Sequence, residues 1–188
     1  CGGLLGLPSN LWFIGTANHD ETPKGFADKN DGRQHVMELP RKPSEFDVVG
    51  PQARRPIGHA DLMQAFRRAK KVHGEAVREG FQGLTREIGT VLERDFRIAW
   101  GPRQERQASD FAPVVIGAGG SAAEAFDHLL ATKVLRKLRD RHDTRADDLS
   151  KLKQQIEKAW ASAKLDSPPA KSNDLLDGEI RRLDRGDE

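Results

Sequence analysis

The spacing of apolar residues after residue 58 constrains the fold of this chain more than any other feature. Apolar side chains recur there at intervals of three and four residues, which is the period of an α-helix with one buried face. The stripes consist of Leu62, Met63, Phe66, Ala69 and His73; Val77, Phe81, Leu84, Ile88, Val91 and Leu92; Phe111, Val114, Val115 and Ala118; Phe126, Leu129, Leu130, Val134, Leu135 and Leu138; and Leu149, Leu152, Ile156, Trp160 and Ala163. This pattern predicts a helical unit over residues 59–165.

Local signals divide this unit into helices. Gly74 is expected to end the first helix, and Pro102 suits the first turn of a later one, in which Pro113 should introduce a kink. Ser121 and Glu124 have the spacing of a capping box, so that another helix should begin there.

Thr144 and Asp147 show a similar start signal for the last helix of the unit, and the Ser-Pro-Pro sequence of residues 167–169 should end it. Residues 166–188 form a charged tail. A short helix is expected in that tail on Leu176, Ile180 and Leu183.

The first forty residues read differently. Residues 11–14 are a continuous apolar run, typical of a strand that is buried on both faces of a parallel sheet, and residues 35–39 form a second short strand that Pro40 ends. The expected fold class is therefore mostly α with a small β part. The expected regions are an α/β part over residues 1–40, a proline-rich linker over 41–58, the helical unit over 59–165 and the charged tail over 166–188.

Composition excludes several classes of protein. No apolar run approaches the ~18 residues of a membrane span, and Cys1 as the single cysteine excludes a disulfide scaffold. A formal net charge of +2 gives no argument for nucleic-acid binding. We expect a cytoplasmic protein that does not bind membranes. Because the chain starts at Cys1 without a Met, we interpret it as a segment of a longer protein rather than as a lipoprotein.

A polar cluster follows the first predicted strand, where open α/β sheets bind ligands. Asn18 in this cluster has one donor and one acceptor group, which suits it to orient a water molecule or to contact a phosphate. The residues alone favour equally that Asn18 caps the following turn. His19, Asp20 and Glu21 are adjacent and point in different directions, so that no metal site is predicted.

Four segments are similar to motifs of one protein family. Residues 10–18 (Asn-Leu-Trp-Phe-Ile-Gly-Thr-Ala-Asn) resemble the sensor 1 strand of AAA+ ATPases of the McrB/dynein-related (MoxR-like) group. Residues 26–40 look like the next element of that group, a short helix, an arginine and a strand that ends in proline. Residues 100–103 are similar to the start of the lid helix that holds the sensor 2 arginine, and residues 124–139 resemble a later lid helix.

The resemblance implies a role for three residues. Asn18 would be sensor 1 and would polarise the attacking water, Arg33 would be the arginine finger that reaches a neighbouring subunit, and Arg103 would be the nucleotide-binding sensor 2. It also implies the fold, namely the C-terminal end of an AAA+ α/β core with two strands, followed by an all-α lid. ATP and Mg²⁺ are the implied cofactors. The implied partners are further copies of the chain, in a hexameric ring formed through the Arg33 side, and a nuclease or other effector.

The chain lacks a Gly-x-x-x-x-Gly-Lys-Ser/Thr phosphate loop and a strand that ends in Asp-Glu. Alone it should therefore be inactive, with the Mg²⁺ ligands outside it, whereas the intact protein would couple ATP hydrolysis to remodelling or translocation in bacterial defence or restriction. One alternative function is a non-catalytic helical interaction module of AAA+ ancestry. The other is nucleic-acid binding, with DNA contacted by a basic cluster that equally suits a solvated helix face or a subunit contact. That cluster consists of Lys133, Arg136, Lys137, Arg139, Arg141 and Arg145.

Overall fold

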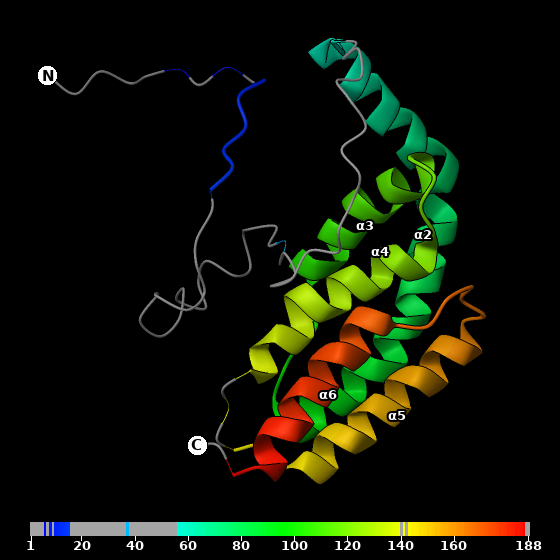
Figure 1. Ribbon diagram of the computed structural model, residues 1–188. Helices are drawn as coiled ribbons and strands as arrows, with labels where there is room; N and C mark the ends of the chain where they lie inside the picture. Colours follow the sequence, from blue (N-terminus) through cyan, green and yellow to red (C-terminus); the bar gives the residue numbers. More distant parts are fainter. Residues whose placement is uncertain are drawn as a thin grey trace, which may run out of the picture.

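The computed structural model describes residues 6, 8, 10–15, 37, 56–139, 141 and 143–186. From residue 59 onward these residues form packed helices (Figure 1). In chain order the elements are α2 (His59–Phe96), α3 (Pro102–Gly117), α4 (Ala122–Leu129), the π-helix η1 (Leu130–Val134), the 3-10 helix η2 (Leu135–Leu138), α5 (Ala146–Ser162) and α6 (Ala170–Asp184). The described part is therefore mostly α, as the apolar periodicity predicts.

The two predicted strands are not present among the described residues. Residues 11–14 belong to no helix or strand, and their side chains are exposed, with Ile14 at 92%. Met37, the described residue of the second predicted strand at 35–39, is also outside any strand and is 78% exposed. A strand needs a neighbour for its backbone hydrogen bonds, and no described segment pairs with residues 11–14. The remaining residues of the predicted α/β part, 1–40, lie outside the described ones apart from 6, 8, 10 and 15.

The prediction that Gly74 ends the first helix is wrong, because α2 continues through it to Phe96. A glycine inside a helix costs about 1 kcal/mol relative to alanine. Burial of one large apolar side chain contributes about 1.5–3 kcal/mol, and the second half of α2 buries a whole stripe of them. The stripe consists of Val77, Phe81, Leu84, Ile88, Leu92 and Phe96. Packing therefore outweighs the local cost of the glycine.

Helix α3 runs antiparallel to α2. Lys70 Nζ of α2 lies 2.7 Å from Asp110 Oδ1 of α3, and further along the pair Gly117 packs against Ala69. A Cβ atom at Gly117 would lie 2.8 Å from the Ala69 Cβ, so that only glycine allows this approach. Pro113, where the sequence predicts a kink, lies inside α3, which continues past it to Gly117.

The predicted capping box at the start of α4 is confirmed. The Glu124 N–H donates to Ser121 Oγ at 3.1 Å, and the Ser121 N–H donates to Glu124 Oε2 at 2.8 Å. The chain then continues through η1 and η2, and the predicted apolar stripe of this stretch is buried throughout. Its buried members are Phe126, Leu129, Leu130, Val134, Leu135 and Leu138.

The start of α5 differs from the prediction. Thr144 is 8% exposed and does not cap the helix, because Arg145 is the N-cap residue and no side chain completes the cap. The short helix expected in the tail is confirmed as α6, whose Leu176 is fully buried. Lys153 of α5 and Asp177 of α6 form an ion pair at 2.7 Å.

One cluster of buried side chains joins these helices. It draws members from α2, α3, α4, η1, η2, α5 and α6, so that each of them contributes to the same hydrophobic core. This core lies entirely in the part of the chain after the predicted linker.

Candidate functional site

The structure describes one of the three residues that the sequence places in a nucleotide site. Asn18 and Arg33 lie outside the described residues. Their roles therefore stay predictions, and the geometry bears only on Arg103 and on the surfaces of the helical part.

Arg103 lies in the first turn of α3, directly after Pro102. The N-cap residue is Gly101, whose N–H donates to Gln104 Oε1 at 3.2 Å and whose carbonyl accepts the Gln104 N–H at 3.0 Å. The Arg103 side chain is exposed. A helix N-terminus favours anions, so that a cation there is better placed when a phosphate is near. The sensor 2 role of Arg103 therefore stays a prediction.

A groove of about 470 Å³ lies beside this helix start, between α2 and the beginning of α3. Its lining residues are Gln82, Thr85, Arg86, Gly89, Thr90, Glu93, Trp100 and Glu105. One cation and two carboxylates give this lining a negative balance, which opposes a triphosphate. Arg103 does not line it. The groove is therefore not the predicted nucleotide site.

Trp100 fixes the loop between α2 and α3. Its ring lies edge-on to Phe81, with 5.2 Å between the ring centroids and 74° between the planes. Its Nε1 atom is buried and has no hydrogen-bond partner among the described residues. The tryptophan thus packs as an apolar anchor and holds the loop that leads to Arg103.

The main buried carboxylate belongs to Asp127 of α4, which is 5% exposed. Its oxygens accept the backbone N–H of Lys171 at 2.8 Å, the backbone N–H of Ser172 at 2.9 Å and the Ser172 hydroxyl at 2.6 Å. Asp127 therefore caps the N-terminus of α6 from a different helix, where Pro169 as N-cap residue offers no side-chain acceptor. No helix-start pattern in the sequence indicates this role, because the cap and the helix are far apart along the chain.

A second hollow of about 360 Å³ lies where α5 leads into α6, and Trp160, Leu165, Pro168 and Asn173 contribute to its lining. The Trp160 indole N–H donates to the Ser167 carbonyl at 2.9 Å, which holds the connecting loop against α5. This arrangement serves the packing of the loop.

The basic cluster predicted over residues 133–145 is not a single solvated face. Lys133 is buried, Arg136, Arg139 and Arg141 are half-buried, and Lys137 and Arg145 are exposed. Arg141 Nη1 donates to the Phe96 carbonyl at 2.6 Å, and Nη2 lies 2.6 Å from Asp143 Oδ2. The hydrogen bonds from Arg141 hold the pKa of the Asp143 carboxyl below its ordinary value and raise the pKa of Arg141. Four of the six cations are thus buried or half-buried, and only Lys137 and Arg145 are exposed.

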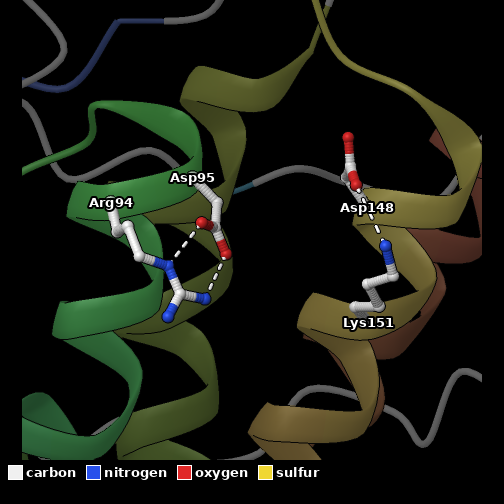
Figure 2. A network of polar contacts seen from close by, with 4 residues as sticks. All are labelled: Arg94, Asp95, Asp148 and Lys151. Carbon is white, nitrogen blue, oxygen red and sulfur yellow. Dashed lines mark hydrogen bonds and ion pairs between the residues drawn. The ribbon is translucent and has the colours of Figure 1, made fainter.

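Near the end of α2, Arg94 and Asp95 form a bidentate pair (Figure 2). The two hydrogen bonds, 2.6 and 2.7 Å long, lower the pKa of Asp95, and the charge of Lys151 on α5 adds to this effect. Lys151 itself lies 3.5 Å from Asp148 (Figure 2). Because all four side chains are well exposed, we interpret this group as a surface network.

Sequence reasoning missed the exposed cations of α2. Residues 67–71 read Arg-Arg-Ala-Lys-Lys, and all four cationic side chains are exposed. The signal was available, since four cations in five residues of a predicted helix cannot all turn toward its buried face.

No group of three or more His, Cys, Asp or Glu side chains in the described part of the chain could hold a metal ion. None of the helices described above is long and apolar enough to cross a membrane.

Comparisons of the chain with protein-family models, curated proteins and solved structures found no match.

Proposed function

We propose that this chain supplies the sensor 1 asparagine, the arginine finger and the helical lid of an McrB-like AAA+ ATPase. Asn18 polarises the attacking water, Arg33 stabilises the transition-state charge in a neighbouring subunit, and Arg103 contacts the phosphates from the lid. Hydrolysis drives remodelling or translocation in the cytoplasm.

The observation that carries the proposal is the order of the motifs along the chain. The segments at residues 10–18 and 26–40 come first, and a proline-rich stretch and a helical unit follow. That unit has its own hydrophobic core, and its third motif places Arg103 exposed in the first turn of α3. A lid that moves as a rigid unit when a nucleotide binds needs its own hydrophobic core, and it needs an exposed cation to contact the phosphates.

The proposed chemistry needs parts that these 188 residues lack. The phosphate loop and the Mg²⁺ ligands come from a preceding segment of the intact protein, and ATP binds between copies in a ring. The arginine finger then acts on the nucleotide of the adjacent copy. A nuclease or other effector coupled to this ring would place the protein in restriction or antiphage defence, a step that rests on family analogy.

The experiment uses the polypeptide that the genome encodes around this sequence. Arg33→Ala should lower ATP hydrolysis by ~10³-fold or more while nucleotide binding stays unchanged, because an arginine finger acts in the transition state. Arg41→Ala, a change of the next basic residue along the chain, is the matched control and should leave hydrolysis within about twofold. Mixing Arg33→Ala subunits with phosphate-loop variants should restore part of the activity.

Asn18→Ala should lower turnover with little change in ATP affinity, as expected for a residue that positions water. The 188-residue chain alone should show no hydrolysis above a blank. Wild-type turnover in Arg33→Ala, or an encoded polypeptide without a phosphate loop, would overturn the proposal. The second result would favour the non-catalytic helical interaction module.

A further inference from the structure

The most concentrated exposed charge in the described part of the chain lies on the first half of α2. Residues 62–74 hold four cations and no carboxylate. Lys70 is paired with Asp110 of α3. Arg67, Arg68 and Lys71 are exposed and form no ion pair with another described residue. We call these three residues the α2 cation patch.

Helix geometry places this patch away from the bundle. At 100° per residue, Arg67, Lys71 and Arg68 fall within one sector of about 100°, opposite the sector that holds Phe66 and Ala69. Ala69 is the residue that contacts Gly117 at the end of α3. The first turns of α2 therefore extend past the end of α3, as Figure 1 shows for the start of that helix. Because residues 67–71 surround Ala69, the patch lies on the outer face of α2 beside the last turn of α3.

The spacing of the three charges suits a linear polyanion. Arg67 and Lys71 are separated by about 6 Å along the helix axis, because each residue rises 1.5 Å. Phosphates of one DNA strand recur every ~3.4 Å along the duplex axis, so that two cations about 6 Å apart reach alternate phosphates. A single small anion would need an enclosing hollow, and the two hollows described above do not include a residue of the patch.

We propose that the α2 cation patch binds the phosphate backbone of double-stranded DNA without reading its sequence. Two of its three members are arginines, whose planar guanidinium groups bind phosphate oxygens in pairs. The helical rod that carries them has the shape that the grooves of a duplex admit. The inference is independent of ATP hydrolysis and rests only on described residues.

The surroundings of the patch favour duplex DNA over other polyanions. Single-stranded nucleic acid is bound by stacking on aromatic side chains, and α2 has no exposed Phe or Trp. Large apolar anchors beside the charges strengthen binding to a membrane surface or a protein partner. On α2, Val72 is the one large apolar side chain that is exposed, at 66%.

The test measures binding of a short DNA duplex of random sequence to the 188-residue chain over a range of salt concentrations. Three phosphate contacts predict a slope of log K against log salt of about −2.7. Replacing the patch by glutamine (Arg67→Gln, Arg68→Gln, Lys71→Gln) should reduce this slope by nearly its whole value and weaken binding at low salt by roughly tenfold or more.

The matched control carries the same loss of three positive charges elsewhere (Lys137→Gln, Arg145→Gln, Lys158→Gln). All three of these side chains are exposed, and two belong to the basic cluster at residues 133–145. The control should bind like the wild type. An equal loss of DNA affinity in both variants would overturn the proposal, because net charge alone would then explain the binding. A loss of affinity confined to the control would overturn it as well and would place the DNA at the basic cluster of residues 133–145.

Competitors decide the class of polyanion. Polyglutamate and vesicles with anionic lipid, added at equal charge, should displace the duplex poorly. Displacement by polyglutamate as effective as by unlabelled DNA would overturn the proposal in favour of an acidic protein partner. Equal displacement by vesicles would point to a lipid surface instead. Because ATP takes no part in the assay, these results do not depend on the proposed function.

Discussion

Two basic stretches of this chain have similar composition and opposite surroundings. Residues 62–74 on α2 expose their cations. Residues 133–145 hold more cations, yet Lys133 is only 5% exposed and Arg141 donates to a backbone carbonyl of α2. A run of cations is thus exposed on α2 and partly buried in residues 133–145. The position of each cation relative to the apolar face of its helix decides whether it is exposed or buried.

The α-helical period predicts only part of the second stretch, because the helix changes type there. Residues 130–134 form a π-helix and residues 135–138 a 3-10 helix, so that the turn per residue is first smaller and then larger than in an α-helix. Counted from Phe126 at about 100° per residue, Lys133 and Lys137 both fall on the apolar face. Lys133 is buried there, whereas Lys137, which follows the change of helix type, is exposed. On α2 the period holds for 38 residues, and the exposed positions follow from it.

The largest effect expected from this comparison is at Lys133. Lys133→Glu should destabilise the fold by about 3 kcal/mol or more, because it reverses a charge whose surroundings are buried. Thermal and urea unfolding followed by circular dichroism would measure the change. Lys137→Glu makes the same charge reversal at an exposed position four residues later and should shift stability by less than about 0.5 kcal/mol. Equal effects at both positions would remove the distinction between internal and surface cations.

Asp127 tests whether a buried anion is as important as the buried cation. Asp127→Ala leaves two backbone N–H groups and the hydroxyl at the start of α6 without their acceptor, at an expected cost of about 2–3 kcal/mol. Asp174→Ala removes an exposed carboxylate from the same helix and should cost less than about 0.5 kcal/mol. Amide hydrogen exchange should show faster opening of α6 only in Asp127→Ala, whereas an unchanged exchange rate would contradict the cap.

The sequence alone predicts the helices whose apolar stripes are long and regular. The capping box of Ser121 and Glu124 is present, and α6 forms where the three apolar residues of the tail suggest it. The predictions at Gly74 and Thr144 are wrong because they rest on the local signal alone. Tertiary packing keeps the chain helical through Gly74 and turns the Thr144 side chain inward.

For the site, the sequence predicts three residues, of which the structure describes only Arg103. Asn18 and Arg33 are predicted from motifs and lie outside the described residues, so that their roles stay predictions. The placement of Arg103 in a first helical turn follows from Pro102 after Gly101. The contacts of Asp127 were not predictable, because they join residues 44 and 45 positions apart. No local pattern contains such a pair, and only the packing of α4 against α6 creates it.

Arg141 gives a smaller effect that depends on pH. Arg141→Ala removes a hydrogen bond to the Phe96 carbonyl and the ion pair with Asp143, and should cost about 1–2 kcal/mol at neutral pH. Because Arg141 lowers the pKa of Asp143, the part due to this pair is fully present above the ordinary Asp value of 3.8. It is lost as the pH falls through the lower pKa of the folded state. The stability difference between variant and wild type should therefore narrow on acidification from pH 5 to about pH 2, and a constant difference would exclude the ion pair as its source.

The smallest change in stability is expected at the α2 cation patch. Replacing Arg67, Arg68 and Lys71 by glutamine removes no ion pair among the described residues and keeps good helix formers at exposed positions. It also relieves repulsion between Arg67 and Lys71, which stand four residues apart on one helix face, by about 0.2–0.5 kcal/mol. The variant should thus unfold within about 0.5 kcal/mol of the wild type, in the stabilising direction if at all, and this gain should shrink in 0.5 M salt. A loss above about 1 kcal/mol in urea unfolding would mean that these cations hold the fold together as Arg141 does, and the contrast between the two basic stretches would then disappear.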